Sequence, residues 1–307
     1  MNDIILKTYA LGKSYGRFNA LEDVNMTIRK GQIYGFIGQN GAGKTTLIRI
    51  ITGLASKTRG NLELFGESQE KKIELARRRM GCIADSPAFY PEKTAYSNLE
   101  LDRIQKGIPG KQCIEKALHM VGLTDAANKR VGSFSLGMKQ RLGIAMALLG
   151  EPELLILDEP INGLDPIGIV EVREMFKRLN TEYGVTILIS SHILSELYQL
   201  ANCYGIIHRG KLIEQITAEE LSNRCKKFLY IKVNDAAKAS VIIEKKLTTS
   251  NYQVLPGNAI KMYDYLDAPG KVSTALATEG VAVEQIMPVG DDLETYFSKV
   301  IGGGNNA

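Results

Sequence analysis

The sequence predicts an α/β fold built on a parallel sheet, and three observations indicate it. An apolar run at 33–37 leads into the glycine-rich segment 38–46, GQNGAGKTT, and a helical apolar pattern follows over 44–54. Two further apolar runs, 154–157 and 185–189, suit central parallel strands that are buried on both faces. Hydrophobic residues make up 44% of the 307 positions, enough for one large domain plus a small one, or for two ordinary domains.

The N-terminal part of the chain predicts strands, and the part after it predicts helices. Residues 1 to about 70 alternate short apolar runs with turn glycines, which favours strands around the glycine-rich segment. From about 71 to 150, charged and apolar residues recur at the helical spacing. A further strand is expected over 204–208. The sequence therefore predicts a large domain over 1–220, in which a helical insertion occupies about 71–150.

A polar, basic helix over 218–227 is expected to join this domain to a smaller one. The elements predicted next are, in order, a strand at 228–233, a helix at 236–247, strands at 252–255 and 259–263, a helix at 270–278 and a strand at 281–288. This order is the split βαβ, or ferredoxin-like, arrangement. A last helix at 293–301 completes a small α+β accessory domain over 228–301, and we expect the polar tail 302–307 to be disordered.

The bulk properties exclude several classes of protein. The net charge is +4, and the basic clusters 77–79 and 226–227 are short and lack interleaved aromatics, so we expect solvated helix faces and no nucleic acid. No apolar run approaches the ~20 residues that span a bilayer, and the polar N-terminus is not a signal peptide. The cysteines form no C-x-x-C pair, which indicates reduced, buried thiols in a cytosolic protein: Cys82, Cys113, Cys203 and Cys225.

Residues 38–46 match the phosphate-binding pattern G-x-x-x-x-G-K-[ST] in its required setting of strand, loop and helix. Its glycines let successive backbone N–H groups point at phosphate oxygens, and the start of the helix adds a positive field. Lys44 is expected to reach the outer phosphates, and the hydroxyl of Thr45 to ligate Mg²⁺. The residues expected to bind the nucleotide here are Gly38, Gln39, Asn40, Gly41, Ala42, Gly43, Lys44, Thr45 and Thr46.

Two polar segments directly follow the other predicted central strands. Asp158 and Glu159 follow the run 154–157; Asp158 is the expected partner of Mg²⁺, and Glu159 is the expected general base that polarises an attacking water. The alternative is a pair of acidic residues that caps the next helix, after a tight turn that contains Asp165. His192 follows the run 185–189, where a ring N–H can reach a γ-phosphate; the alternative is a structural histidine.

The segment 134–141, FSLGMKQR, resembles the signature of ABC ATPases. Ser135 and Gly137 precede a predicted helix whose N-terminus could bind a second anion, although this pattern alone is also an ordinary N-cap. The order of all these motifs over residues 1–220 resembles the ATP-binding subunit of an ABC transporter. The resemblance implies a P-loop (RecA-like) core with an N-terminal antiparallel β subdomain and a helical insert.

The resemblance also implies a mechanism and partners. ATP, with Mg²⁺, lies between the phosphate loop of one subunit and Ser135 and Gly137 of another, so that two copies, or this chain and a similar ATPase, pack head to tail. Tyr15 then stacks on adenine; the alternative is a tyrosine at a strand edge. Separate transmembrane permease subunits are implied, with this chain in the cytoplasm on the inner face of the cell membrane. These subunits would dock on 85–105, where the expected surface anchors are Phe89, Tyr90 and Tyr96. The alternative is that these three aromatic residues belong to the core of the helical insert.

Departures from the family pattern indicate a subgroup. Asp85 stands where the family usually has glutamine, and with the following P-A-F-Y-P it resembles the bacitracin-resistance and lantibiotic-immunity type. Asp85 is an expected magnesium ligand, and the signature carries Leu136 and Met138 in place of a glycine and a polar residue. This subgroup implies export of an antimicrobial peptide or another amphiphile, driven by ATP hydrolysis. The alternatives are a soluble ABC-type ATPase of translation or DNA maintenance, and a nucleotide-binding regulator that does not hydrolyse ATP.

Overall fold

The computed structural model describes residues 3–84, 87–290 and 293–303. The chain divides into two compact units, Met1–Ala218 and Glu219–Ala307. No helix in the described part of the chain is long and apolar enough to cross a membrane. The four cysteines are free, but only Cys203 is fully buried, so the expected burial holds for one of the four thiols.

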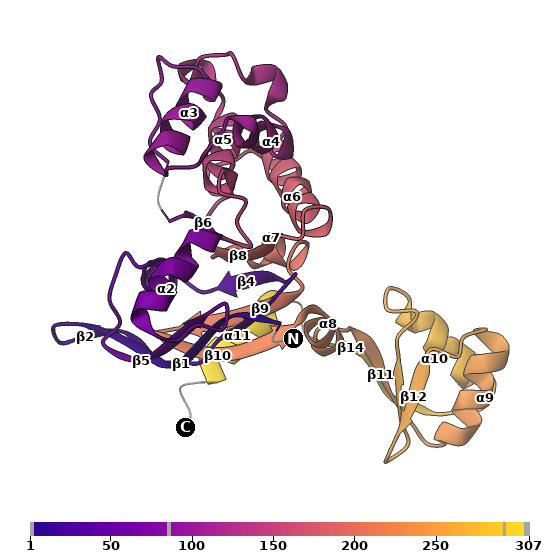
Figure 1. Cartoon of the computed structure of the whole chain (residues 1–307). Coiled ribbons are helices and arrows are strands. Elements are labelled where there is room, and N and C mark those ends of the chain that lie inside the picture. Colours follow the sequence, from indigo (N-terminus) through magenta and orange to yellow (C-terminus); the bar gives the residue numbers. More distant parts are fainter. Residues whose placement is uncertain (1–2, 85–86, 291–292, 304–307) are drawn as a thin grey trace. The chain divides into compact units, whose positions relative to one another are not determined.

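The first unit is built around a six-stranded sheet in the order β10-β9-β4-β8-β7-β6 (Figure 1). Its strands are β4 (Ile33–Ile37), β6 (Met80–Ile83), β7 (Leu154–Asp158), β8 (Thr186–Ser191), β9 (Cys203–His208) and β10 (Lys211–Thr217). Neighbours from β9 to β6 pair in parallel, whereas β10 is antiparallel to β9. β4 and β8 are buried along their whole length, as central parallel strands must be. The predicted α/β fold with a parallel core sheet is confirmed.

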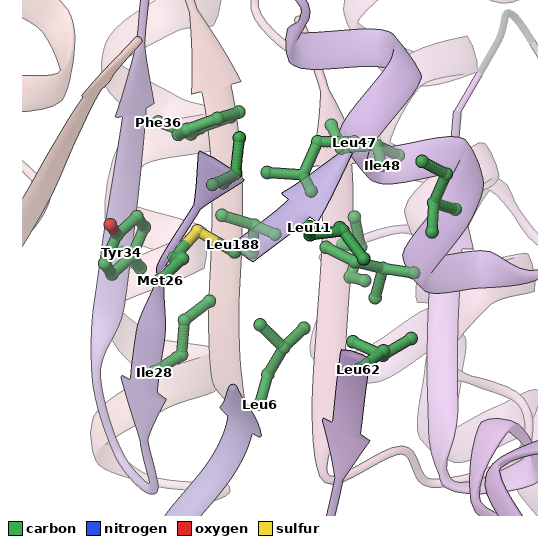
Figure 2. Close-up of a cluster of buried hydrophobic side chains, with 14 of the residues drawn as sticks. Leu6, Leu11, Met26, Ile28, Tyr34, Phe36, Leu47, Ile48, Leu62 and Leu188 are labelled. Carbon is green, nitrogen blue, oxygen red and sulfur yellow. The ribbon is translucent and has the colours of Figure 1, made fainter. Parts of the chain in front are cut away.

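An antiparallel sheet encloses the main core of this unit. It consists of β1 (Ile4–Tyr15), β2 (Phe18–Val24), β3 (Thr27–Arg29) and β5 (Arg59–Leu64). The last three strands each pair with β1. Figure 2 shows buried side chains from both sheets and from α1 (Lys44–Thr52) meeting in one cluster: Leu6, Leu11, Met26, Ile28, Tyr34, Phe36, Leu47, Ile48, Leu62 and Leu188. Because α1 buries its apolar face here, the loop that precedes it is held against the sheet.

The remaining helices of the first unit are α2 (Glu70–Ala76), α3 (Ala95–Gln105), α4 (Gln112–Met120), α5 (Leu136–Leu148), α6 (Pro166–Thr181) and α7 (Leu194–Tyr198), with short 3-10 turns at 77–79, 124–126 and 131–133. α3, α4 and α5 lie together in Figure 1. The helical segment predicted over about 71–150 begins with α2, which starts at Glu70, and β6 then interrupts it by pairing with β7 in the parallel sheet.

The second unit contains a four-stranded antiparallel sheet in the order β12-β13-β11-β14. Its elements are α8 (Ala218–Arg224), which begins at the boundary, β11 (Phe228–Val233), α9 (Ala236–Lys246), β12 (Tyr252–Leu255), β13 (Ala259–Met262), α10 (Pro269–Thr278), β14 (Val283–Val289) and α11 (Leu293–Gly303). α9 and α10 cover one face of the sheet, over a core that includes Leu229, Ile231 and Ile260.

Two sequence expectations change at the edges of this unit. The joining helix ends at Arg224, so Lys226 and Lys227 lie in the connection to β11 and not on a helix face. α11 extends to Gly303 and therefore includes 302 and 303, which we expected in a disordered tail; residues 304–307 lie outside the described residues.

The packing of α5 on β6 generates a prediction about stability. A Cβ atom at Gly81 would lie 2.2 Å from the carbonyl oxygen of Ala147 in α5. We expect Gly81→Ala to lower the free energy of unfolding by about 1–3 kcal/mol, because α5 must move to admit the methyl group. Thermal unfolding measures this loss. Gly150→Ala is the matched control, since a Cβ atom there meets nothing within 4 Å. Equal unfolding temperatures for the two variants would contradict the close packing.

Candidate functional site

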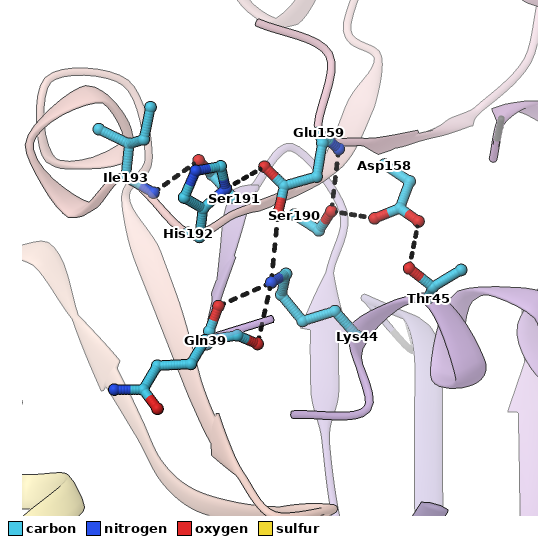
Figure 3. Close-up of polar contacts among 10 residues, drawn as sticks. Gln39, Lys44, Thr45, Asp158, Glu159, Ser190, Ser191, His192 and Ile193 are labelled. Carbon is cyan, nitrogen blue, oxygen red and sulfur yellow. Dashed lines mark hydrogen bonds and ion pairs between the residues drawn. The ribbon is translucent and has the colours of Figure 1, made fainter. Parts of the chain in front are cut away.

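The site lies at the carboxyl ends of three adjacent parallel strands, β4, β8 and β7 (Figure 3). The register pairs Ile37 with Ser191 and Asp158 with Ser190. The segments that follow these strands therefore begin side by side, although the end of β4 lies more than a hundred residues from the ends of β7 and β8 in the chain. This edge is where open α/β sheets bind their ligands.

The glycine-rich loop after β4 is shaped by steric limits on its backbone. Gly41 and Gly43 have φ values of 78° and 111°, which favour glycine over any residue with a side chain. A Cβ atom at Gly38 would lie 2.7 Å from the carbonyl oxygen of Ile207, and one at Gly43 would lie 2.9 Å from that of Ala20. No side chain caps α1, so the positive start of this helix is available to an anion.

The other loop residues differ in their exposure. Gln39, Asn40 and Gly41 are exposed, Thr45 and Thr46 are half-buried, and Ala42 is buried beneath the loop. The loop thus presents its backbone and its polar side chains to the outside, while Ala42 ties it to the main core.

Lys44 is a buried cation whose ammonium group has two kinds of partner. Its side chain is 6% exposed; its Nζ donates to the carbonyl oxygen of Gly38 at 2.6 Å and pairs with Oε1 of Glu159 at 3.2 Å. A buried charge of this kind requires a partner of opposite sign. An anion that enters the loop therefore competes with Glu159 for the same ammonium group.

Asp158 is held by two hydroxyl groups at the end of β7. Thr45 Oγ1 donates to its Oδ2 at 2.7 Å, and Ser190 Oγ donates to its Oδ1. The Thr45 hydroxyl and the Asp158 carboxylate are the hard oxygen ligands that Mg²⁺ prefers. These two residues fit a magnesium ion that takes its other ligands from water and phosphate.

Glu159 contacts both Lys44 and His192. Its backbone has a φ of 50°, and its N–H group donates a hydrogen bond to Oγ of Ser190 at 3.0 Å. Its Oε2 lies 2.8 Å from Nδ1 of His192, so the two residues that we expected to act separately are in direct contact. The helix after the acidic pair is capped by Asp165, which accepts from the N–H of Gly168 at 2.9 Å. Capping by Asp158 or Glu159 is therefore not the role of this pair.

Ser190 is the site residue that sequence reasoning missed. Its side chain is fully buried; its hydroxyl bonds Asp158 and also lies at hydrogen-bond distance from the N–H of Glu159. A polar residue at the carboxyl end of a buried apolar strand was the available signal. The strand order, which places β8 beside β7, was needed to give that signal a meaning.

The remaining predicted residues lie away from this cluster or outside the described residues. Ser135 caps α5 by accepting from the N–H of Met138 at 3.2 Å, and a side chain at Gly137 would meet Leu164. Tyr15 ends β1 with 50% of its surface exposed, and the ammonium group of Lys13 lies 4.8 Å from its ring centroid. Asp85 lies outside the described residues.

Comparisons with known proteins agree with this geometry. The family described as ABC transporter matches residues 21–162. The "Bacitracin transport ATP-binding protein BcrA" of Bacillus licheniformis is 47% identical over 300 residues, 98% of each chain. The "Lantibiotic transport ATP-binding protein SrtF" of Streptococcus pyogenes is 47% identical over 209 residues, 68% of this chain and 89% of that protein. A solved dimer, the ATP-binding cassette MJ0796 bound to ADP and Pi, matches 70% of this chain and 99% of its own at 25% identity, with a TM-score of 0.62.

The buried hydroxyl of Ser190 generates a prediction. Ser190→Ala leaves Oδ1 of Asp158 without this donor inside the protein, so we expect the free energy of unfolding to fall by about 1–3 kcal/mol. Chemical denaturation measures the loss. Ser133→Ala is the control, because that hydroxyl is exposed and bonds only the carbonyl oxygen of Arg130. A loss no larger than that of the control would show that Ser190 does not support the acidic pair.

Proposed function

Since this chain belongs to the ABC transporter family as an ATP-binding subunit, we propose that its ATPase activity drives export of a bacitracin-like or lantibiotic-like peptide. The observation that carries the proposal is the 47% identity to a bacitracin transport protein over 98% of both chains. The similarity extends through the second unit, which favours a shared task over a shared nucleotide-binding core alone. We assign that unit to the split βαβ, or ferredoxin-like, arrangement because its elements follow the order βαββαβ.

ATP binding would use the loop after β4. Backbone N–H groups of 38–46 and the start of α1 face the phosphates, and Lys44 neutralises the outermost of them. Thr45 and Asp158 would hold Mg²⁺, with Asp85 as a further proposed ligand. The ion would neutralise charge on the β- and γ-phosphates.

Hydrolysis would depend on the contacts of Glu159. In the structure its carboxylate is shared between Lys44 and His192, at 3.2 and 2.8 Å. A γ-phosphate beside Lys44 offers that ammonium group a stronger anion, which releases one carboxylate oxygen of Glu159 to polarise a water molecule. His192 fixes the orientation of Glu159 through the other oxygen, and its ring can then contact the γ-phosphate.

A head-to-tail dimer would complete the site. ABC ATPases dimerise and pair with membrane subunits, and the similar cassette bound to ADP and Pi is a dimer. Ser135 is exposed at the start of α5, where it can approach the nucleotide held by a partner copy or by a similar ATPase, together with Gly137. Tyr15, half-exposed at the end of β1, is the proposed stacking surface for adenine.

Separate transmembrane subunits would carry the peptide, with this chain on the cytoplasmic side of the membrane. The docking segment proposed for them is 85–105, of which the structure describes 87–105. Within this segment Tyr90 is 55% exposed. The buried side chain of Asn98 accepts from the backbone N–H of Tyr90 and donates to the carbonyl oxygen of the same residue. Phe89 and Tyr96 are half-buried, so Tyr90 is the most accessible aromatic anchor of the three.

The role of Glu159 is testable with purified protein. We expect Glu159→Gln to slow ATP hydrolysis by roughly a hundredfold or more and to leave ATP bound in a stable dimer, since the amide cannot accept a proton. Phosphate release and size-exclusion chromatography measure the two effects. Glu182→Gln, which neutralises an exposed carboxylate at the end of α6, is the control and should leave turnover unchanged. Near-normal turnover of Glu159→Gln would refute its role as the base.

The transported compound is testable in cells. We expect co-expression of this chain with its membrane subunits in a sensitive bacterium to raise the inhibitory concentration of bacitracin or of a lantibiotic. Glu159→Gln should abolish the increase, because export requires hydrolysis, while Glu182→Gln should preserve it. Unchanged sensitivity to both classes, in cells where the complex hydrolyses ATP, would overturn the proposed cargo and leave the ATPase assignment intact.

A further inference from the structure

The sheet of the second unit has one face that neither α9 nor α10 covers. α9 and α10 pack on the other face, as Figure 1 shows, over the side chains of Leu229, Ile231 and Val233 in β11. Side chains alternate along a strand, so Phe228, Tyr230 and Lys232 project from the face of the sheet opposite α9 and α10. The register places Lys261 of β13 and Met287 of β14 directly beside Tyr230.

Aromatic rings and lysines alternate across this face. Phe228 and Tyr263 lie edge to face with their ring centroids 6.2 Å apart. The ammonium group of Lys261 lies 4.7 Å from the centroid of Phe228, and that of Lys226 lies 4.2 Å from the centroid of Tyr263. Tyr230 lies two residues beyond Phe228 along β11 and opposite Lys261, and its hydroxyl has no hydrogen-bond partner among the described residues. We call these five residues the lysine–tyrosine face.

The charge of the lysine–tyrosine face is positive. Neither Lys226 nor Lys261 forms an ion pair within the described residues. The carboxylate of Asp264 accepts hydrogen bonds from Thr249 and, at 3.0 Å, from Asn251, and the charge of Lys226 also acts on it. At the far end of β11, Lys232 pairs with Glu284 at 3.4 Å. Asp291 and Asp292 follow β14 in the sequence and lie outside the described residues.

We propose that the lysine–tyrosine face binds single-stranded nucleic acid. Bases stack on aromatic side chains of a sheet whatever their sequence, while lysines contact the phosphates between them. A four-stranded sheet with helices on one face and aromatics on its two central strands is a geometry that single-stranded RNA uses. The inference concerns the second unit alone and does not depend on the proposed transport function.

Other occupants fit this face less well. A second copy of the same face would oppose lysines to lysines, which costs free energy. An anionic membrane would favour aromatic rings that protrude, whereas Phe228, Tyr230 and Tyr263 are half-buried in the floor of the sheet. The proposal departs from the expectation of no nucleic acid, which rested on the absence of aromatics beside 226–227 in the sequence. Residues 226–230 and 261–263 are separated in the chain and become neighbours only when β11 pairs with β13.

Fluorescence anisotropy of the full-length protein with a labelled single-stranded RNA of about ten nucleotides tests the proposal. Excess ATP is present throughout, so that the phosphate loop does not capture the probe. We expect saturable binding that weakens with salt, and a loss of affinity of about tenfold or more for Lys226→Gln combined with Lys261→Gln, and for Tyr230→Ala. Tyr230→Phe keeps a stacking surface and should bind like the parent protein.

The matched control is Lys238→Gln combined with Lys245→Gln, which removes the same charge from exposed positions of α9. It should retain the affinity of the parent, and all variants should keep the parent's unfolding temperature and ATPase rate. Absence of binding at low salt, or equal weakening by the control pair, would overturn the proposal. Binding of the parent to phosphatidylglycerol vesicles but not to the RNA would overturn it in favour of a membrane.

Discussion

The neutralisation of one buried ammonium group is the constraint around which the first unit is organised. Lys44, at the start of α1, is 6% exposed, and its charge is balanced by Glu159, which follows β7. Because that pairing spans more than a hundred residues of sequence, it is available only if β4 and β7 end at the same level with β8 between them. The same carboxylate contacts His192, so one ion pair connects all three strand ends.

The parallel sheet and the main core hold these strand ends in place. β4 and β8 are buried throughout, and α1 packs Leu47 and Ile48 into the same cluster, so the glycine-rich loop is fixed at both of its ends. Ser190 adds a buried hydroxyl that holds the carboxylate of Asp158 beside the hydroxyl of Thr45. The polar site can therefore be rigid without being enclosed, which suits a surface that a second subunit is proposed to complete.

Sequence reasoning recovered the residues of the site better than their contacts. The candidates 38–46, Asp158, Glu159 and His192 could be predicted because each follows an apolar strand in a short, contiguous motif. Ser190 was missed, and the contact of Glu159 with His192 was not expected, because both depend on strand order. The helical segment does begin at about 71, with α2, but its interruption by β6 is fixed by the pairing of that strand with β7.

The sequence by itself determined the α/β class, the parallel strands and the glycine-rich loop, because these depend on local periodicity and on contiguous glycines. Only the tertiary structure decided which side chains share a charge and which face of the second unit lies away from α9 and α10. Lys226 and Lys261 illustrate the reason: pairing of β11 with β13 brings them over the rings of Tyr263 and Phe228. Strand register is a long-range property, and a short sequence window contains no measure of it.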